Sequence, residues 1–407
     1  MNVVPPWQLR ARFARSLSDL YAHEVPGHTR LVDVTARVNA DVLRRDGATA
    51  QRLGGIERVT AERHAAIGVG TPAELRRAGQ IFAALGMHPV GAYDPGDVAA
   101  RPAPAVSTLF RPVDPGELAR APFRVFASVL VPGDRRSCTA EHRQCVFPPE
   151  LLGLAERAEA EHGLPPEDAR RFLGLATAAF RASRAPVDLT PRVLDIDELN
   201  RRMAERGIAV ADEIQGPPRW DGPDILLRRT SFGPRCAAEA RGIALTPAGW
   251  ARYEAMTAET DRLLAIDPGL SRQEAAAKIW AMCLPGTQAG LARRDLAYFT
   301  FHATDPAHRR DGLGPPAGLA GLLHGGWITA RPIVYEDALP LPDDALPPPD
   351  PDSTALGADW LAGVLERPVH DPDEHYARQR RDSLDEAARA LGIAPIATPV
   401  APPWPPD

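Results

Sequence analysis

The 407-residue chain lacks the features that mark secreted and membrane proteins. It has only four cysteines, too few for a disulfide framework in a chain of this length. It has no run of about 18 apolar residues, the length that a transmembrane helix requires. Its first residues lack a charged region followed by an apolar core, so no secretory signal is expected. These absences predict a soluble, cytoplasmic protein.

A strong charge of one sign is also missing. The chain carries 47 Lys and Arg against 53 Asp and Glu, a formal net charge of -6, and no basic block stands out. Nucleic-acid binding is therefore not expected. The basic residues are almost all arginine, and alanine and proline are abundant, which is typical of a GC-rich bacterial genome. The length is enough for one large domain or two to three modules.

Hydrophobic periodicity predicts a mixed α+β chain. Helical spacing of apolar residues, with capping residues at several starts, predicts helices over 7–22, 30–45, 71–86, 195–206 and 354–393, further helical segments within 150–182, and helices that begin at Pro247 and after Ser271. Short apolar runs predict strands at 64–70, 87–93, 107–110, 123–131, 208–214, 225–229 and 241–245.

Proline and aspartate dominate residues 338–353, a composition typical of an extended linker or loop. We therefore expect three parts. The main domain covers residues 1–340, the linker covers 341–353, and a helical extension with a tail covers 354–407.

The most informative stretch runs from Glu62 to Thr71. A histidine follows an arginine and enters a short apolar run that ends in Gly-Thr-Pro, which predicts a strand followed by a helix. A side chain on a strand is held more rigidly than one on a loop, which suits a metal ligand. His64 is therefore the first candidate ligand.

A series of different short motifs follows one another along most of residues 8–340. They include Glu62-Arg63-His64, Gly86-Met87-His88-Pro89-Val90-Gly91, Phe110-Arg111-Pro112, Leu189-Thr190-Pro191-Arg192 and Arg241-Gly242-Ile243-Ala244-Leu245. In this order they resemble the 2-oxoadipate dioxygenase/decarboxylase (hydroxyglutarate synthase) family of the vicinal-oxygen-chelate superfamily. The resemblance implies an α+β fold in which βαβββ modules form a cupped sheet with added helices.

The resemblance also implies a metal centre of two histidines and one carboxylate, which leaves positions open for substrate and dioxygen. The first histidine matches His64, and the carboxylate matches Glu239. A second family glutamate falls at Ala237, so the assignment of Glu239 has a competitor. The second histidine falls at Asp188, where this chain has a carboxylate. One imidazole and two carboxylates form a harder site, open to Fe²⁺, Mn²⁺ or another divalent ion; loss of the metal is the alternative.

The implied substrate contacts also differ from the family pattern. The family arginine that binds a substrate carboxylate, four residues after the first histidine, falls at Gly68. A loop that touches substrate through its backbone reads Leu341-Pro342, and proline removes a backbone donor. A substrate other than 2-oxoadipate is therefore an open alternative.

Several further residues are candidates with a structural alternative. Arg63, Arg192, Arg228 and Ser231 are candidate substrate contacts, although each arginine is also typical of a structural ion pair. Tyr335 and Glu336 are candidates for residues that orient the metal ligands without binding the metal themselves. His88 is more typical of a buried structural histidine. Cys138, His142 and Cys145 lack an evident fourth ligand for zinc, which favours an unligated loop.

The activity that the resemblance implies is that of a non-heme iron dioxygenase/decarboxylase. It converts a 2-oxo acid to a shortened 2-hydroxy acid with release of CO₂; for the family, 2-oxoadipate becomes 2-hydroxyglutarate. Two alternatives remain open: a non-redox isomerase or lyase of the same superfamily, and a binding scaffold without catalysis. The expected partners are a small-molecule 2-oxo acid and dioxygen, with no nucleic acid and no membrane. The sequence does not predict an oligomeric state.

Overall fold

The computed structural model describes residues 3–47, 64–93, 105–130, 147–182, 188–210, 214, 228–232, 236–240, 242–305, 314–333 and 351–398. The chain divides into two compact units. The first unit consists of Met1–Ile214, Arg229–Glu239 and Leu341–Asp371. The second unit consists of Gln215–Arg228, Ala240–Pro340 and Pro372–Asp407.

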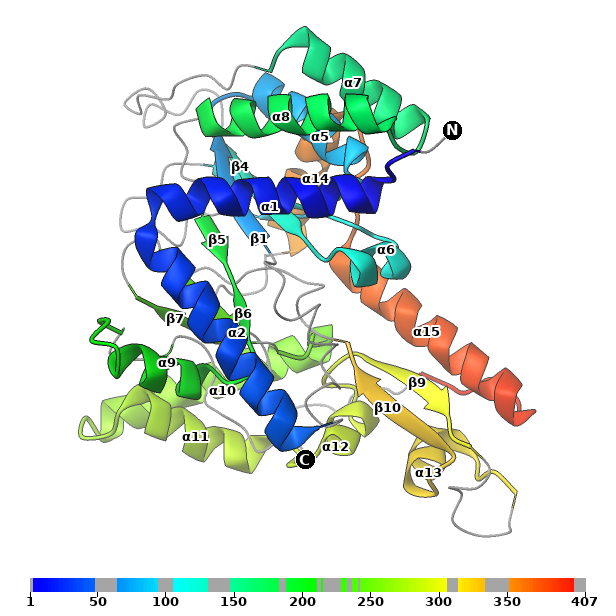
Figure 1. Ribbon diagram of the computed structural model, residues 1–407. Helices are drawn as coiled ribbons and strands as arrows, with labels where there is room; N and C mark the ends of the chain where they lie inside the picture. Colours follow the sequence, from blue (N-terminus) through cyan, green and yellow to red (C-terminus); the bar gives the residue numbers. More distant parts are fainter. Residues whose placement is uncertain are drawn as a thin grey trace. The chain divides into compact units, whose positions relative to one another are not determined.

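A five-stranded sheet forms the centre of the first unit (Figure 1). Its strands are β1 (His64–Val69), β2 (His88–Tyr93), β3 (Ala105–Arg111), β4 (Arg124–Leu130) and β5 (Asp188–Thr190), in the order β2-β3-β4-β1-β5. β1 runs parallel to β4, whereas the other neighbouring pairs are antiparallel. The helix α5 (Pro72–Ala84) connects β1 to β2, and the short helix α6 (Pro115–Arg120) lies between β3 and β4. The expected βαβββ module is therefore present.

Hydrogen bonds between side chains and backbone amides of the same segment stabilise the turn from β1 into α5. The Thr71 hydroxyl accepts a hydrogen bond from the Glu74 amide at 3.2 Å, and Pro72 occupies the first turn, where its missing N–H costs nothing. The Glu74 carboxylate reaches past Thr71 and accepts from the Gly70 amide at 2.8 Å. The start of α5 is thereby fixed to the end of β1.

Helices cover one face of this sheet. They are α1 (Pro6–Glu24), α5, α7 (Pro149–Ala160) and α8 (Pro166–Ala182), joined by α14 (Pro351–Leu365) through Leu361 and Leu365. Aromatic rings fill the space between them: Phe180 stacks on Phe82 at 5.4 Å and meets Phe13 edge-on at 5.7 Å. Burial of these large rings contributes strongly to the stability of the unit.

A second, smaller sheet repeats the pattern of the first. β6 (Arg192–Val193), α9 (Ile196–Ala204), β7 (Arg228–Ser231) and β8 (Ala237–Ala240) follow one another, with the sheet order β6-β8-β7. This order matches β1-β4-β3 of the first sheet. The helix α2 (Pro26–Asp46) packs on α9 and β6. The expected α+β fold is confirmed, with a four-stranded βαβββ module followed by a related module of three strands.

Only Pro191 separates β5 from β6, so one segment of chain belongs to both sheets. Proline has no amide hydrogen to donate to a ladder, which suits the point where the chain leaves one sheet for the next. Its carbonyl still accepts a hydrogen bond from the Glu239 amide at 3.1 Å. This junction fixes β8 beside the last strand of the first sheet.

Three predicted elements differ from the structure. Residues 208–210 are not a strand, since they are partly exposed and pair with no described strand; of the rest of 208–214, only Ile214 lies inside the described residues. Within 242–245, isolated bridges at Ile243 and Leu245 stand in place of a ladder, and Leu245 pairs with Ala297. α14 begins at Pro351, inside the predicted linker, because proline is tolerated in a first helical turn.

The second unit is mainly helical. Its elements are α10 (Pro247–Ile266), α11 (Arg272–Cys283), α12 (Gln288–Arg293), β9 (Phe299–Ala303), α13 (Gly318–His324), β10 (Ile328–Pro332) and α15 (Pro372–Leu391). β9 and β10 pair antiparallel, and α15 packs along β9. The predicted capping box at Ser271 and Glu274 is formed. Within the described ranges, no helix combines the length and the apolar character that crossing a bilayer demands.

Candidate active site

The two faces of the first sheet differ in chemistry. Successive residues of a strand point to opposite faces, and residues paired across strands share a face. The residues on the core side are apolar and buried: Ala65, Ile67, Val69, Phe110, Val125, Ala127, Val129 and Leu189. The pairing places other strand positions on the opposite face, which we call the polar face. They include His64, Ala66 and Gly68 of β1, Arg124, Phe126 and Ser128 of β4, Ser107, Leu109 and Arg111 of β3, His88 and Val90 of β2, and Asp188 and Thr190 of β5.

A row of basic residues crosses one end of the polar face. His64 pairs with Arg124 on one side, and His88 pairs with Arg111. The pairing of Phe110 with Val125 places Arg111 and Arg124 one step further along the same ladder. Both arginine side chains are buried, at 0% and 1% exposure. Two guanidinium groups therefore lie on the same face as the first candidate ligand.

Solvent reaches the middle of the polar face. On β1 and β4, Ala66, Gly68, Phe126 and Ser128 are half-buried, whereas the residues between them are buried. All four lie on the polar face. The Ser107 hydroxyl donates a hydrogen bond to the Ser128 hydroxyl at 2.7 Å. The half-buried patch thus lies next to the basic row on the same face of the sheet.

The first two candidate ligands lie on adjacent strands. Thr190 pairs with His64 and Asp188 pairs with Ala66, so His64 and Asp188 are diagonal neighbours on the polar face. The Cβ atoms of such diagonal positions lie roughly 7 Å apart. That spacing suits two side chains that bind one ion through bonds of about 2 Å. The structure describes the backbone of both residues and leaves their side chains outside its description.

The third candidate, Glu239, meets the same segment from β8. Its amide bonds to the Pro191 carbonyl, and its carboxylate Oε2 lies 2.6 Å from Nη1 of Arg192. Both side chains are buried, at 1% and 0% exposure. Asp188 thus lies in the segment 188–192, and His64 and Glu239 each lie on a strand that bonds to this segment. The competing position, Ala237, carries no donor group and leaves Glu239 as the only acidic residue of β8.

The three candidate ligands fit a divalent metal ion both in the type of their donor atoms and in the strands that carry them. An imidazole and two carboxylates supply nitrogen and oxygen donors that Fe²⁺ and Mn²⁺ accept. Among the side chains that the structure describes, no group of three His, Cys, Asp or Glu converges on one point, and the side chains of His64 and Asp188 are not among those described. The fit therefore rests on the strand pairing.

The other predicted site residues fall in different places. Arg228 and Thr230 are buried whereas Arg229 and Ser231 are half-buried, so Arg228 and Ser231 lie on opposite faces of β7. Arg63, Tyr335 and Glu336, like Cys138, His142 and Cys145, lie outside the described residues.

His88 is half-buried, and its ring meets that of His370 edge-on at 6.0 Å. Burial, followed by the charge of His370, lowers the pKa of His88. The histidine is thus held in its neutral form.

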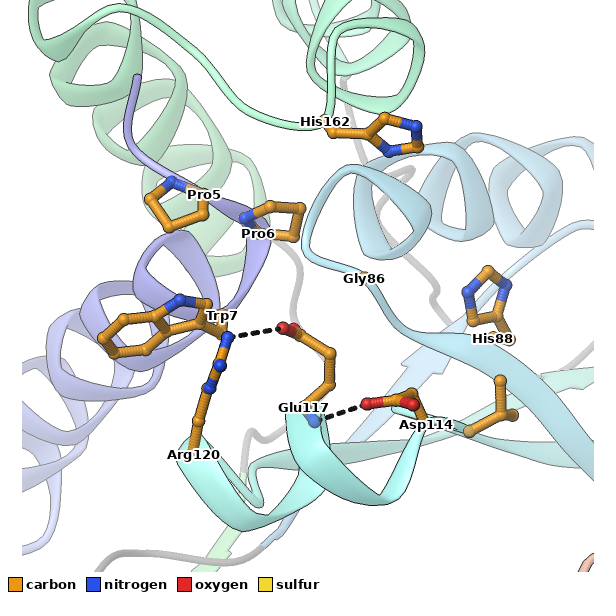
Figure 2. Close-up of a pocket in the computed structure, with 10 residues that line it drawn as sticks. Pro5, Pro6, Trp7, Gly86, His88, Asp114, Glu117, Arg120 and His162 are labelled. Atoms are coloured by element: carbon orange, nitrogen blue, oxygen red, sulfur yellow. Dashed lines mark hydrogen bonds and ion pairs between the residues drawn. The ribbon is translucent and has the colours of Figure 1, made fainter. Parts of the chain in front are cut away.

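A hollow of about 390 Å³ lies where α1 and α6 begin, and His88 is among the residues that line it (Figure 2). The Asp114 carboxylate accepts from the Glu117 amide at 2.8 Å, and Glu117 pairs with Arg10 at 3.3 Å and with Arg120 at 3.7 Å. Arg120 also lies over the Trp7 ring at 6.0 Å. These polar groups, which the sequence does not single out, hold α6 against α1 and make the hollow a structural feature.

Taken together, the two modules with their open sheets and flanking helices define an α+β protein. The family model for 2-oxoadipate dioxygenase/decarboxylase matches residues 13–190, 188–235 and 236–345. The chain is 42% identical over 437 residues to the 2-oxoadipate dioxygenase/decarboxylase of Mycobacterium tuberculosis, with 91% of this chain and 95% of the relative covered. The corresponding Pseudomonas putida protein is 31% identical, with 96% and 98% covered. The chain belongs to the 2-oxoadipate dioxygenase/decarboxylase family.

Solved structures support the same assignment. The crystal structure of hydroxyglutarate synthase from Pseudomonas putida in complex with 2-oxoadipate superimposes with a TM-score of 0.80 at 30% identity, covering 97% of this chain and 100% of that one. A second crystal structure of hydroxyglutarate synthase from Pseudomonas putida gives a TM-score of 0.79 at 31% identity. The fold is thus shared over almost the whole length of both chains.

Proposed function

We propose that this protein is a non-heme Fe²⁺-dependent dioxygenase/decarboxylase that converts a 2-oxo acid to a 2-hydroxy acid one carbon shorter. Three observations support the proposal: Asp188 lies beside His64 on a paired strand, the Glu239 amide bonds to Pro191 of the same segment, and the chain belongs to this family. With 2-oxoadipate, one dioxygen is consumed, and one CO₂ and one 2-hydroxyglutarate are formed, which balances all atoms. The low cysteine content suits an enzyme of the reducing cytoplasm.

His64, Asp188 and Glu239 would hold the metal. When bound, the ion supplies a Lewis acid and a template for substrate and dioxygen. The two carboxylates make the site harder than one with two imidazoles, so Mn²⁺ is the closest competitor of Fe²⁺. Tyr335 and Glu336 remain predicted to support these ligands.

The chain's own residues bind and orient the substrate. A dicarboxylic 2-oxo acid is a dianion, and Arg111 and Arg124 give the polar face a matching positive charge beside His64. The carbon chain of the substrate lies over the half-buried patch at Ala66, Gly68, Phe126 and Ser128. Gly68 leaves this space open because it has no side chain. Arg63, Arg228 and Ser231 remain predicted substrate contacts.

The decisive experiment measures metal content and oxygen uptake on anaerobically purified protein. About one iron per chain is expected for the wild type, with iron lost in His64→Ala and in Glu239→Ala. Addition of 2-oxoadipate is expected to release CO₂ in step with oxygen consumption. Turnover that needs metal but ignores dioxygen would favour an isomerase or lyase, and a protein that takes up no Fe²⁺ would favour the binding scaffold. Either result overturns the proposal.

A further inference from the structure

A buried ion pair joins β8, which carries the candidate ligand Glu239, to its neighbour β6. Arg192 of β6 and Glu239 of β8 meet at 2.6 Å, with exposures of 0% and 1%. We infer that Arg192 is a positioning residue that orients the Glu239 carboxylate, and that Asn39 in turn positions Arg192. This inference rests on the proposed function, in which Glu239 is a metal ligand, and it replaces the predicted role of Arg192 in binding substrate.

The partner of Arg192 argues for a positioning role. Its guanidinium contacts the Glu239 carboxylate at 2.6 Å, and both side chains are buried in that pair. A planar guanidinium holds a carboxylate in one orientation better than an ammonium group does. That geometry suits a group whose task is to aim an oxygen of Glu239.

Asn39 of α2 holds the backbone on both sides of Val193. Its side-chain amide donates to the Arg192 carbonyl at 3.0 Å, and its side-chain oxygen accepts from the Leu194 amide at 2.7 Å. Asn39 is fully buried within the helix. Asparagine is a poor residue for a helix interior, and a buried amide is costly unless it is bonded. The bridge to β6 accounts for its presence there.

These contacts connect α2 to the candidate metal ligand Glu239 through Arg192. Asn39 sets the position of the Arg192 backbone, Arg192 sets the carboxylate of Glu239, and the Glu239 amide returns to Pro191 of the same segment. Groups that contact a metal-binding side chain without binding the metal fix its direction, and their loss typically costs about 10–100-fold in metal affinity.

The test compares Fe²⁺ affinity, substrate KM and thermal unfolding in the full-length wild type, Arg192→Lys, Arg192→Met and Asn39→Ala. The matched control is Arg10→Met, which removes another fully buried arginine that bonds Leu85, Glu117 and Ala121. The Arg192 variants are expected to bind Fe²⁺ about 10–100-fold more weakly, with Arg192→Lys the milder. At saturating iron, the KM of Arg192→Lys for 2-oxoadipate is expected to stay near that of the wild type. Arg10→Met is expected to unfold at a lower temperature without a comparable change in affinity.

The outcomes separate this inference from the proposed function. A wild type that binds no Fe²⁺ overturns the proposed function. A wild type that binds Fe²⁺, together with Arg192 variants that bind it equally well but show a raised KM, overturns the inference alone. Should Arg192→Met not fold, Arg192→Lys, which keeps the charge, and Asn39→Ala carry the same measurement.

Discussion

Asp188 lies diagonally across from His64 on the polar face, because Thr190 pairs with His64 and Asp188 pairs with Ala66. We infer that Asp188 takes the place of the second family histidine on the same face of the sheet as His64. Such a replacement changes the donor group and keeps its place on the strand.

Restoring the histidine with Asp188→His is expected to change metal preference. An imidazole favours Fe²⁺ over Mn²⁺ and Mg²⁺ more than a carboxylate does. We expect the ratio of Fe²⁺ to Mn²⁺ affinity to rise about tenfold, equivalent to about 1.4 kcal/mol. Competitive metal titration under anaerobic conditions measures this ratio. In the control Asp188→Asn, which keeps the size and removes the charge, affinity for both ions should fall. An unchanged ratio in Asp188→His would show that residue 188 does not bind the metal.

Gly68→Arg is expected to tighten the binding of dicarboxylic 2-oxo acids. Gly68 is a half-buried strand residue on the polar face, where the extended backbone accepts any side chain. A new charge-assisted hydrogen bond contributes about 1.5–3 kcal/mol, which corresponds to a KM for 2-oxoadipate that is lower by about 10–100-fold. The monocarboxylic acid 2-oxohexanoate is the control substrate, and Gly68→Gln is the control variant. If the KM values of both acids fall equally, the effect does not come from the distal carboxylate.

Phe180→Ala is expected to destabilise the first unit. The buried ring contacts Phe13, Phe82 and Phe147, with centroids at 5.4–5.7 Å. Truncating a buried phenylalanine costs about 3–5 kcal/mol in the free energy of unfolding. Urea unfolding followed by circular dichroism measures the loss, and Phe180→Leu, which keeps most of the volume, should cost less. A loss below about 1 kcal/mol for Phe180→Ala would contradict the packing described here.

The stability of the first unit is expected to fall as the pH drops below about 6.5, the ordinary pKa of histidine. Burial, and then the charges of His370 and Arg367, lower the pKa of His88, against the opposing effect of Glu159. The unfolded chain therefore binds a proton at a pH where the native state does not, and protonation favours unfolding. The melting temperature of His88→Gln should fall less than that of the wild type between about pH 7.5 and 5.5. His23→Gln, at an exposed position of α1, is the control; if it flattens the profile equally, His88 is not the cause.

Much of the fold follows from local patterns in the sequence. α1, α2, α5 and β4 occur where amphipathic spacing or apolar runs predict them, since each buries a single continuous face. β8 escapes such a prediction because its sequence, Ala-Ala-Glu-Ala, favours a helix. Pairing with β6 and β7 overrides that preference.

The candidate site is predictable in part for the same reason. The place of His64 on a strand follows from its apolar neighbours, and the strand ladder confirms it. The contact of Arg192 with Glu239 depends on how two distant strands meet, which no local pattern encodes. Asn39 carries a weak signal, a polar residue directly after the core residue Val38. Only its bonds to β6 explain it.

The single-residue junction at Pro191 limits how this enzyme family can be engineered. In the first sheet, Thr190 pairs with His64 and so fixes the register of β5 against β1. In the second sheet, Arg192 contacts Glu239 and so links β6 to β8. One residue inserted between them turns the following side chains to the opposite face. A chimera that exchanges the second module for that of a relative therefore has to be spliced outside residues 188–193, and surface loops that connect other elements are safer places for added sequence.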